Sequence, residues 1–282
     1  MLRIREMRPA DIPFAARLTN MENWEIPQSD FARILRLDGR GSFVATVGRR
    51  RVGLVTTAHY GRRIAWIGNV VVKREYRKRH IGQQLVDQAV NYLIKNHAKH
   101  VALYCFKENV QFYRKLGFVQ GARFVRLRRE PKPFLSKLPV EAPFQPLNLP
   151  SVLAIDRKGF GADRHQLIRS LLNEGLAWYL SCRGASSASY LLVKNYEDMN
   201  EIGPWVSFGL NSGELNLLLQ LVINKSARKP IEIACPIDSR ALKILKKNGF
   251  HPTNEGRAMY FKHVARIGRP RAIVAHGFLD KG

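Results

Sequence analysis

The stretch that decides the fold reads Val72-Lys73-Arg74-Glu75-Tyr76-Arg77-Lys78-Arg79-His80-Ile81-Gly82-Gln83-Gln84-Leu85. It follows the apolar run Ile64–Val72, which predicts a buried strand, and it leads into apolar residues that recur at a helical period as far as Ile94. A strand end, a basic turn and a helix N-terminus together predict an anion-binding site. The free N–H groups of a first helical turn and the helix dipole both favour negative charge. Gly82 leaves the backbone room to approach a phosphate oxygen closely.

This stretch resembles the acetyl-CoA signature of the GNAT superfamily of N-acetyltransferases, V-x-P-E-Y-R-x-x-G-x-G-x-x-L. The residues that match at the family spacing, besides Val72, are Glu75, Tyr76, Arg77, Gly82 and Leu85. Two residues depart from the pattern: Arg74 replaces a proline, and His80 replaces the first glycine. A side chain at His80 is tolerated in this turn if its φ is negative.

A second motif follows the predicted strand Val101–Phe106. It reads Asn109-Val110-Gln111-Phe112-Tyr113-Arg114-Lys115-Leu116-Gly117-Phe118 and resembles the GNAT motif that ends in Y-x-x-x-G-F. Its spacing predicts a short helix that ends at Gly117 and carries Asn109 and Tyr113 on one face. With both motifs in order, the resemblance covers nearly all of residues 1–130.

The resemblance implies which residues form the site. Acetyl-CoA would be the cosubstrate, with no metal. Backbone groups of Val70 and Val72 would meet pantetheine and the thioester oxygen, and Asn109 would line the pantetheine arm. Tyr113 would be the catalytic residue, protonating the leaving thiolate. The turn residues implied to bind the cofactor are Arg77, Lys78, Arg79, His80, Ile81, Gly82 and Gln83.

The general base has no obvious candidate. Many relatives place a glutamate on the strand that corresponds to Ile64–Val72, but this strand contains no acid. Asn69 holding a water and His59 near the preceding turn are alternatives, and the base is left unassigned. Trp24 lies where related proteins have a loop on the substrate side, as either a packing residue or a wall of the amine site.

Composition bounds the class of protein. The 282 residues carry 47 Lys+Arg against 22 Asp+Glu, a formal net charge of +25, with 45% hydrophobic residues. These values predict a globular protein of about two domains with a strong attraction for anions. No apolar run reaches membrane-span length, and the first residues lack the apolar core of a signal peptide. The three cysteines show no metal-ligand spacing. We expect a soluble, cytoplasmic protein.

The order of predicted elements indicates an α+β fold. It contains a strand, helices, an antiparallel group of strands and one parallel crossover from Ile64–Val72 to Val101–Phe106. The resemblance extends this to tandem GNAT-like domains. Each would be a twisted, mostly antiparallel sheet with a parallel βαβ crossover flanked by helices.

Clustered prolines predict a semi-rigid linker over residues 131–150. It would separate a GNAT acetyltransferase domain at 1–130 from a C-terminal domain at 151–282. Short matches at nearly constant offsets suggest that the second domain is a copy: Ile67-Gly68 recurs as Ile202-Gly203, and Gly117-Phe118 as Gly249-Phe250. The copy has no basic side chains in place of the phosphate-binding turn. We therefore expect a degenerate GNAT-like domain that closes the acceptor side of the cleft.

These features predict an acetyl-CoA-dependent N-acetyltransferase. It would act on a primary amine of a small molecule, a protein lysine or an N-terminus, by direct attack on the thioester. One alternative is a non-catalytic regulatory protein that binds an acyl-CoA. Another is a basic, nucleic-acid-associated protein acetyltransferase, in which Arg123, Arg126, Arg128 and Arg129 form a basic edge. The acceptor, the length of the acyl group and the oligomeric state remain open.

Overall fold

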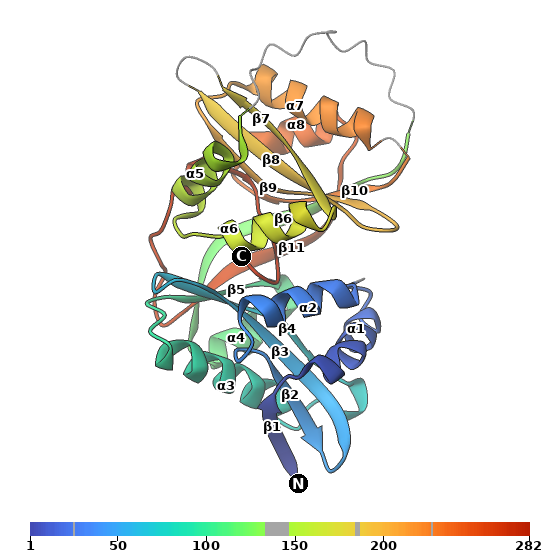
Figure 1. The fold of residues 1–282 in the computed structure, drawn as a ribbon, viewed down its shortest axis with the longest axis vertical. Coiled ribbons are helices and arrows are strands. Elements are labelled where there is room, and N and C mark those ends of the chain that lie inside the picture. The colour runs from blue at the N-terminus through green and yellow to red at the C-terminus, as the bar shows by residue number, and fades with distance from the viewer. Residues whose placement is uncertain (25, 133–146, 184–186, 227) are drawn as a thin grey trace.

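The computed structural model describes residues 1–24, 26–132, 147–183, 187–226 and 228–282. Two lobes are stacked along the long axis, and one sheet runs through both (Figure 1). Its strands follow the order β1-β2-β3-β4-β5-β11-β6-β10-β9-β8-β7, and β12 pairs with β9 outside this path. The fold is a mixed, mostly antiparallel sheet flanked by helices, which confirms the predicted α+β class.

The first lobe contains both motif regions. Its elements are β1 (Leu2–Glu6), α1 (Ile12–Asn20), α2 (Gln28–Leu37), β2 (Phe43–Val47), β3 (Arg50–Tyr60), β4 (Ile64–Val72), α3 (Ile81–Lys95), β5 (Val101–Phe106), α4 (Val110–Lys115) and β6 (Phe118–Arg129). The predicted strands 64–72 and 101–106 match β4 and β5 and pair in parallel as expected. The sequence patterns did not single out α2, which packs through the buried Phe31 and Ile34.

The second lobe repeats this arrangement. Its elements are α5 (Leu149–Phe160), α6 (His165–Asn173), β7 (Ala177–Arg183), β8 (Ala188–Asn195), β9 (Asn200–Phe208), α7 (Ser212–Lys225), β10 (Ile231–Pro236), α8 (Ala241–Lys247), β11 (His251–Phe261) and β12 (Ile273–Ala275). Of the predicted linker, residues 133–146 lie outside the described residues, and Leu149 and Pro150 already belong to α5. The boundaries at 130 and 151 stay a prediction.

The two lobes exchange a strand. β11 of the second lobe lies between β5 and β6, and β6 of the first lobe lies between β11 and β10. In Figure 1 the green β6 runs up into the second lobe while the red β11 runs down into the first. Because backbone hydrogen bonds continue across this junction, the lobes share one sheet.

Alternation along the strands fixes the layers of the first lobe. Val44 and Leu54 belong to the core that contains α1 and α2, whereas their neighbours Ala45 and Val55 belong to the core beneath α3. Successive side chains of a strand point to opposite faces, so helices cover both sides of this part of the sheet. Within α3, the buried residues that face the sheet are Leu85, Val86, Ala89, Val90 and Leu93.

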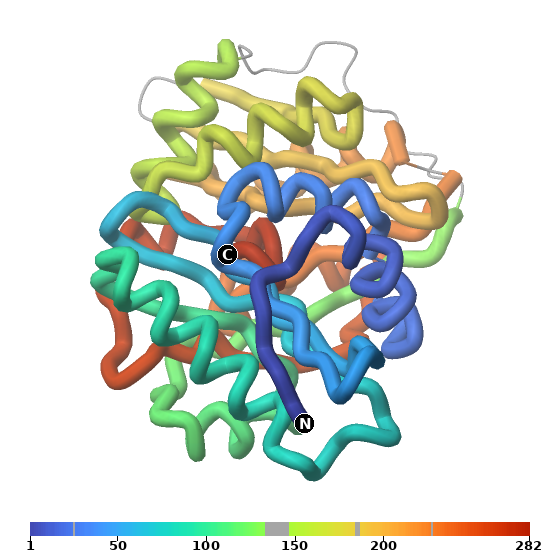
Figure 2. Tube along the Cα trace, turned by 60° about the horizontal axis from the view of Figure 1, so that its bottom comes forward, coloured from blue at the N-terminus to red at the C-terminus, as the bar shows by residue number. Residues whose placement is uncertain are grey.

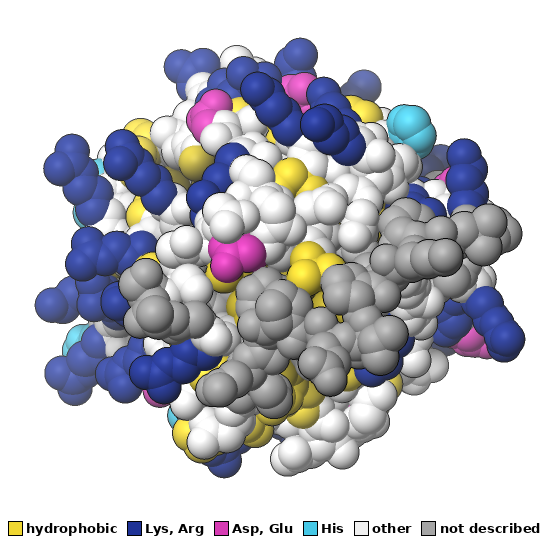
Figure 3. All heavy atoms as spheres, turned by 90° about the horizontal axis from the view of Figure 1, so that it is seen from above, with side chains coloured by type: hydrophobic (Ala, Val, Ile, Leu, Met, Phe, Trp, Pro, Cys, Tyr) yellow, Lys and Arg dark blue, Asp and Glu magenta, His cyan; other side chains and the backbone are white. Residues whose placement is uncertain are grey.

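The large positive charge is spread over the surface. On the face seen in Figure 3, Lys and Arg side chains project around the rim, with few acidic side chains between them. Three of the four arginines of the predicted basic edge form ion pairs with acids across the strand exchange. Arg126 and Arg128 both contact Glu232 on β10, and Arg123 contacts Glu255 on β11. Among the described residues, no helix is both long and apolar enough to cross a bilayer.

Candidate active site

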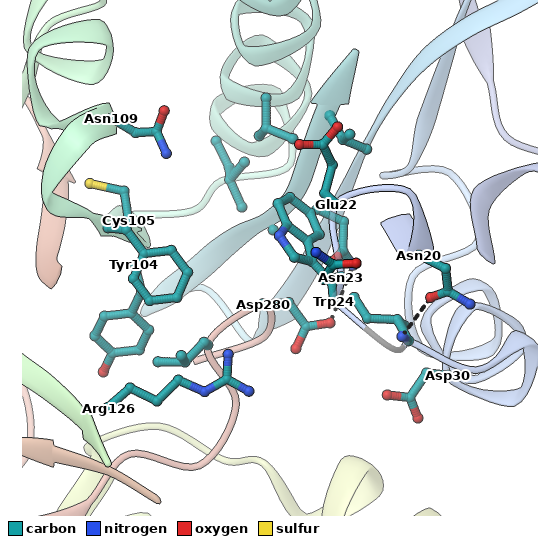
Figure 4. A pocket seen from close by; sticks show the side chains of 18 of the residues that line it. Asn20, Glu22, Asn23, Trp24, Asp30, Tyr104, Cys105, Asn109, Arg126 and Asp280 are labelled. Atoms are coloured by element: carbon teal, nitrogen blue, oxygen red, sulfur yellow. Dashed lines mark hydrogen bonds between the residues drawn. The ribbon is translucent and has the colours of Figure 1, made fainter. Parts of the chain in front are cut away.

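A large pocket opens where β4 and β5 diverge. The two strands pair only at Ala65–Val101 and Trp66–Ala102, after which β5 continues its pairing with β11. The gap beyond Trp66 leads into a cavity of about 1170 Å³. In Figure 4, Tyr104, Cys105 and Asn109 lie on one side of this cavity and Glu22, Trp24 and Asp30 on the other.

A bulge in β4 shapes the floor of the gap. The β3–β4 register passes from Leu54↔Val71 to Thr56↔Gly68, so two residues, Asn69 and Val70, stand opposite one. Asn69 takes a left-handed conformation with φ of +51°, which asparagine tolerates better than most residues. A bulge leaves its extra residue outside the ladder. Val70 of this bulge lines the pocket, as does Val72, which is paired with Gly53.

The basic turn wraps the N-terminus of α3. His80 precedes the helix with φ of +55°, and Lys78 has φ of +61°. The condition for an unstrained side chain at His80, a negative φ, is not met: the turn keeps the left-handed conformation that a glycine would adopt. Histidine is among the residues enriched there, and the strain costs about 1–2 kcal/mol. No side chain caps the α3 N-terminus, so its first amides stay available to a ligand.

Gly82 lies in the first turn of α3. A Cβ there would meet Phe112 at 3.5 Å, an ordinary contact. The protein itself therefore has room for a Cβ at this position, and Gly82 lines the pocket.

Arg77 holds the turn in place. Its Nε donates to the carbonyl of Val72 (3.0 Å), and its Nη2 donates to Glu22 (2.5 Å), which follows α1. Arg74 also contacts Glu22. Within the described chain, the side chain of Lys78 makes no ion pair and remains available to an anion.

The pocket lining brings together most of the residues implied by the resemblance. The implied residues that line it are Val70, Val72, Arg77, Lys78, His80, Ile81, Gly82, Gln83, Asn109 and Tyr113. Arg79 is the exception, because its guanidinium lies over the ring of Tyr76, 5.3 Å from the ring centre. The binding roles of these residues stay predictions.

Tyr113 reaches the pocket from α4. Its ring packs edge-on against Phe112 and Phe118, and burial raises the pKa of its hydroxyl. Within the described chain this hydroxyl makes no hydrogen bond, so it is free to donate to a ligand. Cys105 also lines the pocket, but burial and Glu108 raise the pKa of its thiol to about 12. That thiol is neutral at physiological pH and a poor nucleophile.

Residues 7–118 match the model described as the acetyltransferase (GNAT) family, and residues 152–269 match an acetyltransferase (GNAT) domain model. Together the two matches cover most of the chain. The chain belongs to the GNAT acetyltransferase family.

Whole-chain relatives share the tandem arrangement. An uncharacterized N-acetyltransferase of Bacillus subtilis, YitH, is 22% identical over 269 residues, covering 89% of this chain and 88% of the relative. The structure of a proposed acetyltransferase from Pyrococcus horikoshii aligns with a TM-score of 0.81 at 23% identity, covering 100% of this chain and 96% of that one. A tandem GNAT protein from the clavulanic acid biosynthesis pathway aligns with a TM-score of 0.66 at 14% identity, covering 94% and 100%. These likenesses establish the tandem GNAT fold.

The second GNAT lobe lacks an open gap. β9 and β10 pair in parallel only from Asn200↔Ile231 to Ile202↔Ile233. Beyond that point β12 pairs with β9, and the N–H of His276 donates to the carbonyl of Ala234 on β10 (2.8 Å). The segment 273–277 therefore occupies the place that stays open between β4 and β5.

The helix that follows β9 is also closed to anions. The side chain of Asn211 accepts hydrogen bonds from the N–H groups of Gly213 and Glu214, and Glu214 accepts one from the N–H of Asn211. This capping box occupies amides that are free at the start of α3. Its acidic member also repels a phosphate.

The side of the pocket away from the basic turn contains residues that the sequence patterns did not single out. Asp280 and the β8–β9 connection at 195–199 line it, together with Asp30 of α2. Trp24, for which the sequence allows either a packing role or a place in the wall of the amine site, also lines the pocket and is 36% exposed. His59, one alternative for the base, does not belong to the lining. No local pattern marks Asp280, because it reaches the pocket through tertiary structure alone.

Proposed function

We propose that this chain is an acetyl-CoA-dependent N-acetyltransferase that transfers the acetyl group to a primary amine by direct attack on the thioester. Family membership supports acyl transfer from a CoA thioester. The observation that carries the proposal is the gap between β4 and β5, which joins the free amides of α3 to the hydroxyl of Tyr113. A cofactor with phosphates at one end and a thioester at the other fits this arrangement.

The roles follow from the chemistry of the groups. The pyrophosphate would lie on the first turn of α3 beside Lys78, where amides and the helix dipole favour negative charge. The bulged backbone near Val70 would donate to the thioester oxygen as the carbonyl carbon becomes tetrahedral. Tyr113, protonated at neutral pH, would donate to the departing thiolate.

Direct attack is favoured over an acyl-enzyme intermediate. Cys105 is the pocket's cysteine, and its thiol is held neutral by burial. An acyl-cysteine route needs a thiolate at this position. The amine would therefore attack the thioester itself, and the reaction would pass through a ternary complex.

Two measurements on the full chain test this proposal. Calorimetry measures acetyl-CoA binding, and release of free CoA thiol is followed with n-butylamine, spermidine, a lysine-containing peptide and a free peptide N-terminus. Binding with amine-dependent release of CoA supports the enzyme. Binding without acetylation of any amine supports the alternative of a regulatory acyl-CoA-binding protein.

A further inference from the structure

The segment 273–282 ends inside the cleft of the first lobe. After β12 it crosses β4 at Gly68, where a Cβ would collide with the carbonyl of Asp280. Figures 1 and 2 both show these last residues between the two lobes. The segment is held by Lys194, which donates to the carbonyl of Gly277 (2.9 Å), and by Tyr60, which donates to that of Lys281 (2.5 Å).

Along this path, the carboxylate of Asp280 comes to lie in the pocket. Asp280 Oδ2 accepts hydrogen bonds from Asn69 Nδ2 (3.2 Å) and from Lys281 Nζ (2.6 Å). Its side chain is 21% exposed and lines the cavity. In Figure 4 it lies between Trp24 and Tyr104. Within the described chain, Oδ1 makes no hydrogen bond, so one oxygen is fixed by the protein and the other is available to a ligand.

Asn69 connects this carboxylate to the thioester site. Its side chain is buried and also donates to Thr56 (3.0 Å). It immediately precedes Val70, whose backbone is proposed to meet the thioester oxygen. A carboxylate bonded to Asn69 therefore lies on the acceptor side of the bulge.

The surroundings of Asp280 suit a cation. The charged and titratable groups near it are Lys281 beside it, Asp30 of α2, Tyr60 of β3 and Tyr196 after β8. Two further cations line the same pocket, and each pairs with an acid: Lys194 of β8 with Glu201, and Arg126 of β6 with Glu232. The positive charges of Lys281 and Arg33 offset the negative charges of Asp30 and Asp280, with which they form ion pairs behind the cavity wall. Farther out, the exposed Glu197 and Asp198 have no partner within the described chain. In a protein of net charge +25, this wall attracts an ammonium ion while the basic turn opposite attracts phosphates.

We propose that Asp280 is the base that takes a proton from the incoming ammonium group of the acceptor. This inference rests on the proposed function. Asp280 accepts one proton from R–NH₃⁺ and passes it to solvent, leaving R–NH₂. The amine nitrogen then attacks the carbonyl carbon, and the C–N bond forms as the C–S bond breaks. The thiolate receives the proton of Tyr113, and the second proton lost by nitrogen restores that hydroxyl.

The test compares wild type, Asp280→Asn and the control Asp87→Asn, which removes an exposed carboxylate from α3. Calorimetry measures acetyl-CoA binding, and kcat/KM for spermidine and a lysine-containing peptide is measured from pH 6 to 9. We expect Asp280→Asn to bind acetyl-CoA like wild type and to lose about 10²-fold in kcat/KM at pH 7. The difference in kcat/KM between Asp280→Asn and wild type becomes smaller as pH rises, because solvent then deprotonates the amine. Asp87→Asn behaves as wild type.

Activity of Asp280→Asn within about threefold of wild type, with an unchanged pH profile, overturns the assignment. If Asp280→Asn does not fold, the pH dependence of kcat/KM of the wild type tests the proposal. A kcat/KM that rises tenfold per pH unit across the whole range shows that no enzyme base is at work, whereas a plateau near neutrality supports Asp280. A wild type that binds acetyl-CoA and acetylates no amine instead removes the proposed function, and this assignment with it.

Discussion

The side-chain amide of Asn69 donates a hydrogen bond to the carboxylate of Asp280, although the two residues are 211 positions apart in the sequence. Asn69 forms the bulge of β4 in the first GNAT lobe, and Asp280 arrives on the segment that first closes the gap of the second lobe. The second lobe thus contributes a carboxylate to the pocket of the lobe that carries the basic turn.

Replacing Tyr113 with phenylalanine should separate binding from catalysis. The substitution removes only the hydroxyl and keeps the ring contacts with Phe112 and Phe118. We expect kcat to fall by about two orders of magnitude, because the thiolate loses its proton donor. The Kd for acetyl-CoA, measured by calorimetry, should stay within about threefold of wild type. An unchanged kcat would remove Tyr113 from the mechanism.

Gly82→Ala should weaken cofactor binding without unfolding the chain. A Cβ at Gly82 meets only ordinary contacts in the protein, so the added side chain fills space that the phosphates need. We expect the Kd for acetyl-CoA to rise at least about tenfold, a loss of about 1.4 kcal/mol. Gln84→Ala, an exposed change two residues along the same helix, is the control and should leave the Kd unchanged. Equal affinities in all three proteins would contradict a phosphate site at this turn.

One chain should bind one acetyl-CoA. The second lobe has its gap filled by residues 273–277 and the start of α7 occupied by its own capping box. Calorimetric titration of the full chain should therefore give a single class of site at a 1:1 ratio. A second equivalent of cofactor bound with similar affinity would show that the filled gap opens.

His276 should make the fold sensitive to acid. Burial, together with the charge of Arg164, lowers the pKa of His276 to about 3, and Nδ1 of its ring shares a hydrogen bond with the hydroxyl of Tyr104 (2.8 Å). The unfolded chain has a histidine pKa near 6.5, so it binds this proton while the folded state does not. Stability from this group is complete above about pH 6.5 and declines from there towards pH 3, by at most about 1.4 kcal/mol per pH unit.

Denaturant unfolding of wild type and His276→Phe at several pH values checks this dependence. The free energy of unfolding of wild type should fall more steeply below pH 6.5 than that of the variant. Parallel curves would show that the ring is accessible to protons in the folded chain.

The local parts of this structure are predictable from sequence because their signals are local. β4, the turn and α3 follow from an apolar run, a cluster of basic residues and a helical period within about thirty residues. The strand exchange is not predictable from sequence, because nothing in β6 or β11 specifies which lobe supplies the neighbouring strand. The position of Asp280 in the pocket is not predictable either, because it depends on tertiary structure and not on a local pattern. The positive φ of His80 is not predictable from its residue type, because the backbone of the turn outweighs the preference of its side chain.

The most direct test of the account follows the acetyl group itself. Acetyl-CoA labelled in the acetyl carbonyl is incubated with the full chain and a primary amine, and the label is traced in amine, CoA and protein. We expect the label in the amine product as an amide, in an amount equal to the free CoA released, with none retained on the protein. Label on a protein side chain, or bound acetyl-CoA that never loses its acetyl group to any amine, would contradict it.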